Sequence, residues 1–148
     1  MSITATHTAT TAHTTAHTTA GVPSRAAVRT GTVISVLVGL FLLFDASIKL
    51  LRLPAVVEAT VQLGFPAHTV QVMGTLLLIS LVVYAIPRTS VFGAVLITGY
   101  LGGAVCANVR VDAPLFGYVL FPIYVAVLVW LGLYLRNAAL RQLVRTGR

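Results

Sequence analysis

The sequence predicts an all-α integral membrane protein in which four spanning helices form a bundle. Hydrophobic residues make up 57% of the 148 residues and charged residues only 9%, whereas soluble domains carry roughly 25% charged residues. A chain this short cannot bury so much apolar surface within itself, so much of that surface must face lipid. Four apolar stretches, at about 30–51, 69–86, 90–109 and 115–135, each approach the roughly 20 residues that a helix needs to cross a bilayer. We therefore expect one membrane domain over residues 25–138.

The first 24 residues differ in character from this domain. They consist mainly of Thr, Ala and His without apolar periodicity, and such a segment buries too little surface to offset its chain entropy. We expect a disordered tail. His7, His13 and His17 lie in it without an acidic neighbour, so they provide no preformed metal site, and we expect no metal.

The first span, about 30–51, carries two charges near its end. Asp45 and Lys49 are four residues apart, so they share a helix face and can pair. A charge at the bilayer centre costs roughly 2.5–3.5 kcal/mol on insertion scales, so Asp45 must face the bundle or water. Two interpretations stay open: the pair closes the helix end while Lys49 reaches the interface, or it forms one wall of a ligand or proton site.

The connector from Arg52 to His68 predicts a short interfacial helix between spans one and two. Pro54 suits a first helical turn, whereas Gly64 and Pro66 end a helix. His68 follows this helix, and as a lone histidine it favours an interfacial hydrogen-bonding role over a ligand role.

The third span, about 90–109, is rich in small residues. Gly99, Gly102 and Gly103 belong to rows of small side chains spaced four apart. Such rows let helices approach closely in lipid, so we expect these glycines to pack against neighbouring helices. The single cysteine of the chain, Cys106, lies in the same span and excludes an internal disulfide.

The fourth span, about 115–135, contains Pro122, which cannot donate a backbone hydrogen bond and should kink the helix. The following residues, 139–148, alternate arginines with aliphatic residues. They predict a basic juxtamembrane segment on anionic lipid.

The charges also predict orientation. With four spans, both tails and the turn at 87–89 share one side, which carries seven arginines and no acidic residue. The opposite side carries as many acidic as basic residues. By the positive-inside rule, both termini lie in the cytoplasm of a multi-pass plasma (inner) membrane protein. Because the positive charge sits at segment ends, it indicates topology and not nucleic-acid binding.

Polar residues from three spans should meet near the outer face. Spans one and three both end there and span two begins there, so their polar residues lie at one depth. An ionisable residue inside a membrane indicates a functional site unless it belongs to a satisfied ion network, and both interpretations stay open here. The candidate pocket residues are Asp45, Lys49, His68, Gln71, Asn108 and Arg110. They show no metal-ligand spacing and no nucleophile with a base, so we expect no catalytic residues and no metal.

Several motifs resemble those of the DoxX-like family of small four-span membrane proteins. They are PRTSVFGAVLITGYLGGAVCANVR (87–110), FDASIKL (44–50), LGFP (63–66) and WLGLYLR (130–136). The resemblance covers about residues 32–138. It implies a four-helix membrane fold and, more loosely, a redox or quinone association. Family members often read THVR where this chain reads Ala107-Asn108-Val109-Arg110, so Asn108 cannot supply any imidazole chemistry of its relatives.

Ligand count argues against an autonomous oxidoreductase. His68 is the only histidine outside the tail, and one cysteine cannot form a dithiol. We therefore expect a non-enzymatic or accessory inner-membrane protein. The resemblance to the DoxX-like family implies that it belongs to a respiratory, quinone-linked or oxidant-defence assembly. Quinone is the one cofactor the resemblance points to. The expected partners are the lipid bilayer, a membrane redox protein and further copies of the chain, without nucleic acid. The alternatives are a small carrier or channel that uses the outer-leaflet pocket, and a purely structural membrane partner.

Overall fold

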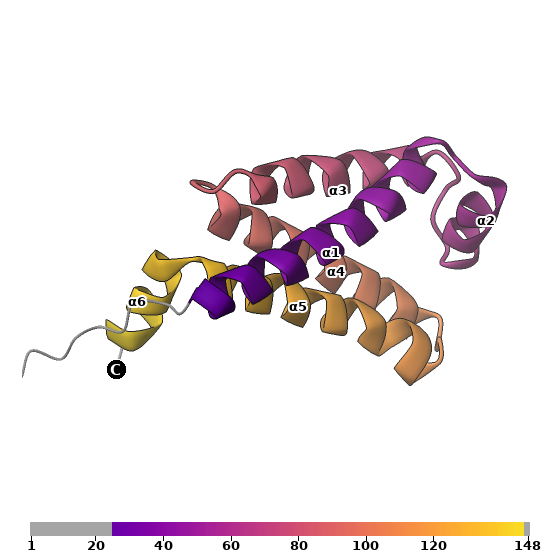
Figure 1. Ribbon diagram of the computed structural model, residues 1–148. Coiled ribbons are helices and arrows are strands. Elements are labelled where there is room, and N and C mark those ends of the chain that lie inside the picture. Colours follow the sequence, from indigo (N-terminus) through magenta and orange to yellow (C-terminus); the bar gives the residue numbers. More distant parts are fainter. Residues whose placement is uncertain (1–24, 147–148) are drawn as a thin grey trace, which may run out of the picture.

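The computed structural model describes residues 25–146, which form helices with short connections and contain no strand (Figure 1). The predicted disorder of residues 1–24 and the histidines there lie outside this range, as do the last two residues of the basic tail. The helices are α1 (Arg25–Leu50), α2 (Pro54–Gln62), α3 (Thr69–Ala85), α4 (Ser90–Arg110), the π-helical η1 (Leu115–Val119), α5 (Leu120–Arg136) and α6 (Ala138–Thr146).

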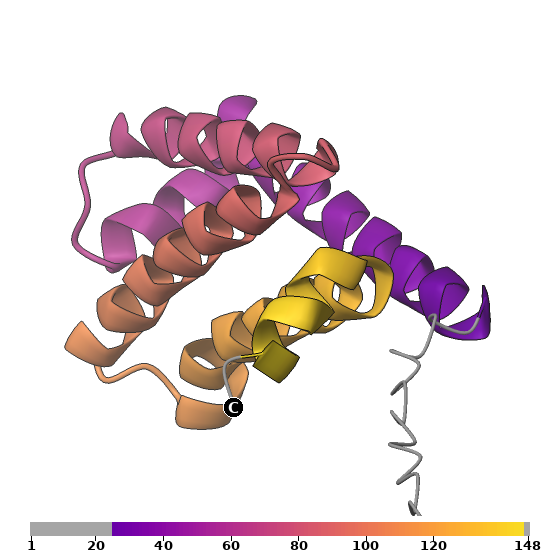
Figure 2. The same ribbon diagram turned by 90° about the vertical axis from the view of Figure 1, so that its left-hand side faces the viewer.

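The four long helices form a ring. α1 packs against α3 and α5, and α4 packs against the same two helices, so α1 and α4 lie diagonally opposite (Figures 1 and 2). α1 ends, α3 begins, α4 ends and α5 begins at one end of the bundle, which we call the α2 end. The opposite end, where α5 leads into α6, is the α6 end.

The lengths and apolar surfaces of these helices match a membrane protein. α1, α4 and the continuous segment Leu115–Arg136 are long and apolar enough to cross a bilayer, while α3 is a shorter apolar helix of 17 residues. Exposed aliphatic side chains follow one face of α3 at a helical spacing: Val72, Leu76, Ile79 and Val82. Because exposing such an apolar surface to water is unfavourable, the outer faces of the bundle are suited to contact with lipid. The predicted all-α membrane bundle is confirmed.

Several close contacts between helices occur at glycines. A Cβ on Gly31 would lie 2.9 Å from the backbone nitrogen of Arg136, and one on Gly132 would lie 2.6 Å from Ser35 Oγ. These two glycines let α1 and α5 touch near the α6 end. On α3, Gly74 does the same toward α1, because its Cβ would lie 2.9 Å from Lys49 Cβ. The absence of a side chain thus sets the helix separation, as in other membrane bundles.

Within the part of the chain that the structure describes, the glycines that were expected to pack closely have no neighbouring helix in contact with them. A Cβ added at Gly99, Gly102 or Gly103 would meet nothing within 4 Å, and all three residues are exposed. The packing glycine of α4 is instead Gly93, whose Cβ would overlap the backbone of Tyr84 on α3. A row of small residues identifies a smooth helix face, but it does not say whether a helix or a hollow lies beside it.

A buried polar cluster joins three helices at the α6 end. The Tyr84 hydroxyl lies 3.1 Å from the Val129 carbonyl oxygen, to which it donates, and 3.1 Å from the hydroxyl oxygen of Ser35. The guanidinium of Arg136 stacks on the Tyr84 ring at 4.9 Å and donates to the Tyr84 carbonyl oxygen at 3.4 Å. This cluster holds α1, α3 and α5 together at the α6 end. The packing of the helices at the α2 end depends on other contacts.

The short elements follow local sequence signals. Pro54 begins α2 and Gly64 follows it with a φ of +81°, so the short helix predicted between the first two spans is confirmed. Asn137 caps α6 by accepting hydrogen bonds from the backbone of Ala139 and Leu140. A π-helical turn, η1, immediately precedes α5, and Pro122 lies in the first turn of α5. The kink expected at Pro122 stays a prediction.

Candidate functional site

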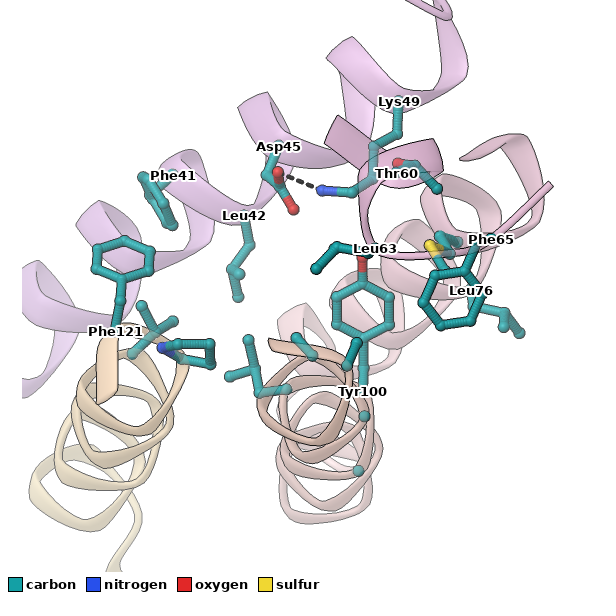
Figure 3. A pocket seen from close by; sticks show the side chains of 18 residues that line it. Phe41, Leu42, Asp45, Lys49, Thr60, Leu63, Phe65, Leu76, Tyr100 and Phe121 are labelled. Atoms are coloured by element: carbon teal, nitrogen blue, oxygen red, sulfur yellow. Dashed lines mark hydrogen bonds and ion pairs between the residues drawn. The ribbon is translucent and has the colours of Figure 1, made fainter. Parts of the chain in front are cut away.

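A cavity of about 490 Å³ lies at the α2 end of the bundle (Figure 3). It is bounded by α1, α2, the α2–α3 connector, α3, α4 and the beginning of α5. Most of its 18 lining residues are aliphatic or aromatic; the polar side chains among them are Asp45, Lys49, Thr60 and Tyr100. Cavities that bind small molecules commonly combine an apolar wall with a few oriented polar groups.

Asp45 and Lys49 form the polar wall on α1. The Lys49 ammonium donates to Asp45 Oδ1, and the Lys49 and Asp45 side chains are only 15% and 29% exposed. The pairing that their i, i+4 spacing predicted is therefore present. Within the described residues the Lys49 ammonium pairs with Asp45 alone, which leaves two of its three N–H donors for a ligand. Because the pair is neutral overall, it favours a neutral ligand over an ion.

Tyr100 contributes a hydroxyl from the opposite helix. Figure 3 shows its ring rising from α4 with the hydroxyl directed toward the side of the cavity where Asp45 and Lys49 lie. This hydroxyl makes no hydrogen bond with any residue of the described range. A donor without a protein partner, aimed into a mainly apolar space, is a natural contact for an acceptor oxygen on a ligand.

Thr60 is the polar residue of α2 in the lining. Its hydroxyl donates to the Val56 carbonyl oxygen at 2.8 Å, which places the hydroxyl against its own helix. The side chain is buried, so Thr60 fixes the inner face of α2 over the cavity. Its oxygen still has acceptor capacity.

Aromatic rings close one side of the cavity. Phe41 on α1 and Phe121 on α5 meet edge to face, with ring centroids 5.7 Å apart and an interplanar angle of 72°. Both rings line the cavity and both also face the outside of the bundle. This geometry is a favourable one for two aromatic rings, and it fills the space between α1 and α5 at the α2 end.

Arg110 holds the connector that covers the cavity. Its guanidinium donates to the Leu63 carbonyl oxygen and lies 5.6 Å from the centre of the Phe65 ring. Leu63 and Phe65 both line the cavity, while Arg110 is exposed and lies outside the lining. Arg110 therefore acts on the cavity by fixing two of its walls, and it is a positioning residue, not a ligand contact.

Three more residues of the predicted polar pocket lie elsewhere. His68 and Gln71 are exposed and outside the cavity lining. Asn108 is half-buried, and its amide donates to the Ala104 carbonyl oxygen on its own helix at 2.8 Å. Of the six candidates the structure thus brings Asp45 and Lys49 into the cavity and places Arg110 beside it. Helical spacing predicted the contact between Asp45 and Lys49, but it did not predict the direction in which the other candidates face.

Tyr100 and the phenylalanines were not among the predicted site residues. The available signal was weak, because an aromatic residue inside an apolar span is usually a core or lipid contact. Among the described residues, no three His, Cys, Asp or Glu side chains gather closely enough to hold a metal ion. The side chains that line the cavity support hydrogen bonding to a neutral head group beside aromatic rings.

Comparison with known proteins identifies one family. A family model described as "DoxX-like family" matches residues 33–132, about two thirds of the chain, and this range includes α1 from its third turn through most of α5. No curated protein and no solved structure matches the sequence. The matched range contains every element that borders the cavity, and the chain belongs to the DoxX-like family.

Proposed function

We propose that this protein is an accessory subunit of a respiratory, quinone-linked or oxidant-defence assembly, and that its cavity holds a neutral amphipathic molecule of the quinone type. It performs no catalysis alone. The positive-inside pattern of the sequence supports cytoplasmic termini, so the α2 end and the cavity face the outer leaflet of the plasma membrane.

The observation that carries this proposal is the Tyr100 hydroxyl, which has no hydrogen-bond partner among the described residues and faces the Asp45–Lys49 pair across an apolar cavity. A quinone ring carries carbonyl oxygens on opposite edges, and these accept hydrogen bonds. Tyr100 on α4 and Lys49 on α1 offer donors from opposite walls. The rings of Phe41, Phe65 and Phe121 offer faces and edges to a planar head. The residues present fit such a group, and when bound it would supply the electron-carrying chemistry that the chain's own side chains do not offer.

The test is mass spectrometry of the lipids that accompany the purified protein. Asp45→Asn combined with Lys49→Gln removes both charges together, so neither is left unpaired in the cavity. Arg52→Gln is the matched control, because Arg52 follows the same helix but lies exposed and outside the lining. We expect a quinone to be enriched over the bulk membrane extract with the wild type and the control, and several-fold less with the double variant. Absence of enrichment with the wild type would refute the proposal.

A carrier is the second candidate, and the backbone of α5 is the observation that favours it. Pro122 lines the cavity and follows a π-helical turn, and such turns often occur where helices carry function. Uptake of a solute into proteoliposomes that disappears with Asp45→Asn would favour a carrier. A structural role alone would leave both the extract and the uptake unchanged in every variant.

A further inference from the structure

The cavity reaches the lipid-facing surface between α3 and α4. Leu76 lines the cavity and is also 54% exposed, on the same face of α3 as the aliphatic residues that suit lipid. Across from it on α4, Gly99 and Gly103 both line the cavity and are exposed. The same hollow therefore touches the polar pair inside the bundle and the outer surface of two helices.

The two glycines leave this side of the cavity open. Among residues 25–146, a Cβ at either position would meet nothing within 4 Å, so no described side chain is in contact with the space beside them. α3 and α4 are in close contact at Gly93, near the α6 end, and they diverge toward the α2 end, where α2 lies between them (Figure 2). The opening lies between the contact at Gly93 and α2, at the level of the missing side chains.

The other exposed side of the cavity is filled. Phe41 and Phe121 are 43% and 47% exposed between α1 and α5, but their rings are in contact there. A long substituent could not leave the cavity on that side without separating the two rings. Between α3 and α4 it would pass over bare helix backbone.

The depth of the opening defines what can pass through it. Gly99 and Gly103 lie near the middle of α4, and Leu76 near the middle of α3, at the level of the hydrocarbon core. Asp45 and Lys49 lie near the α2 end of α1. A molecule that contacts both the polar pair and the opening has a hydrogen-bonding head near the membrane surface and an apolar chain that points into the bilayer.

We propose that Gly99 and Gly103 form a lateral doorway through which the hydrocarbon tail of the bound molecule leaves the cavity between α3 and α4. The ligand is thus a tailed amphiphile that enters from the bilayer and not from water. This proposal rests on the proposed function, since it concerns the other half of the same ligand.

The test compares two probes with the same head. One is 2,3-dimethoxy-5-methylbenzoquinone, which has no tail, and the other is decylubiquinone, which carries a ten-carbon chain. Binding of each to the full chain in lipid nanodiscs is measured by native mass spectrometry. In the variant Gly99→Leu with Gly103→Leu, two large side chains fill the doorway. Gly102→Leu is the matched control, since Gly102 is equally exposed and equally free of neighbours but lies outside the cavity lining.

We expect the wild type and Gly102→Leu to bind both probes. The double leucine variant should keep its affinity for the tail-less probe and lose at least about tenfold for decylubiquinone, an amount that a modest steric cost produces. Unchanged binding of decylubiquinone, or an equal loss of both probes, overturns the doorway and leaves the proposed function standing. If the wild type binds neither probe, the proposed function fails and the doorway fails with it.

Discussion

The guanidinium of Arg110, at the last residue of α4, donates to the carbonyl oxygen of Leu63, which lies 47 residues earlier in the connector between α2 and α3. The same group stacks on the ring of Phe65. The Arg110 side chain thus connects α4 to the connector between α2 and α3, which covers the cavity.

Removing this tie should loosen the connector without unfolding the bundle. Arg110→Gln removes a charge-assisted hydrogen bond and a cation–π contact, which together contribute about 1–2 kcal/mol at an exposed site. We expect amide hydrogen exchange to rise several-fold in the connector, at Leu63 and Phe65, while exchange in the middle of α1 stays the same. Arg88→Gln, at the exposed turn before α4, is the control and should change neither. Unaltered exchange at Leu63 would show that the connector is fixed by other contacts.

The packing glycines and the open glycines should respond oppositely to alanine. At Gly31 an added Cβ would press against the backbone of α5, and overpacking of this kind costs about 1–3 kcal/mol. At Gly102 the Cβ meets open space, so the gain in helix propensity, up to about 1 kcal/mol, should prevail. Thermal unfolding in detergent should therefore fall for Gly31→Ala and hold or rise for Gly102→Ala. A destabilised Gly102→Ala would indicate that this face of α4 is covered in the membrane, as in an oligomer.

The buried hydroxyl of Tyr84 should matter to stability. Tyr84→Phe keeps the ring beneath Arg136 but removes the donor to the Val129 carbonyl oxygen and the partner of Ser35. We expect a loss of about 1–2 kcal/mol in the free energy of unfolding, because the buried cluster loses the hydroxyl that joins Ser35 on α1 to Val129 on α5. Tyr118→Phe serves as the control, since Tyr118 is exposed. Equal unfolding midpoints for the two variants would contradict the importance of this cluster.

The Asp45–Lys49 pair should show strong coupling in a double-mutant cycle. Asp45→Asn alone leaves the Lys49 ammonium in the cavity without its counter-charge. Each side chain is less than one third exposed, so we expect a loss of about 1–2 kcal/mol, below the cost at a fully buried pair. Adding Lys49→Gln should restore most of this stability. If the two losses simply added, the pair would contribute no interaction energy.

The positions of the helices followed closely from the sequence because apolar length and turn residues both mark them. The span expected at 69–86 is α3 (Thr69–Ala85), and that expected at 90–109 is α4 (Ser90–Arg110). The first helix begins earlier than expected, at Arg25, since two arginines do not interrupt a helix that has left the hydrocarbon. The Asp45–Lys49 contact followed from spacing within one helix.

The site was only partly predictable because it depends on how helices rotate relative to one another. A uniformly apolar helix such as α3 carries little information about which face is inside, so Gln71 could be placed by depth but not by direction. Likewise, Gly99 and Gly93 look alike in sequence, yet one borders a cavity and the other touches Tyr84. Tyr100 belongs to the site because α4 faces α1 across the cavity, and the sequence of α4 alone does not show this arrangement.

Both members of the Asp45–Lys49 pair belong to α1, and this has a consequence for biogenesis. α1 enters the membrane before α3, α4 and α5 have been synthesised, so no later helix can compensate its charges at that moment. A lone charge would raise the cost of insertion by roughly 2.5–3.5 kcal/mol near the centre of the bilayer. Because Lys49 lies one turn after Asp45 and binds it within the same helix, α1 carries its own counter-ion during insertion. The polar wall of the cavity is thus complete in the nascent chain, and the later helices enclose it.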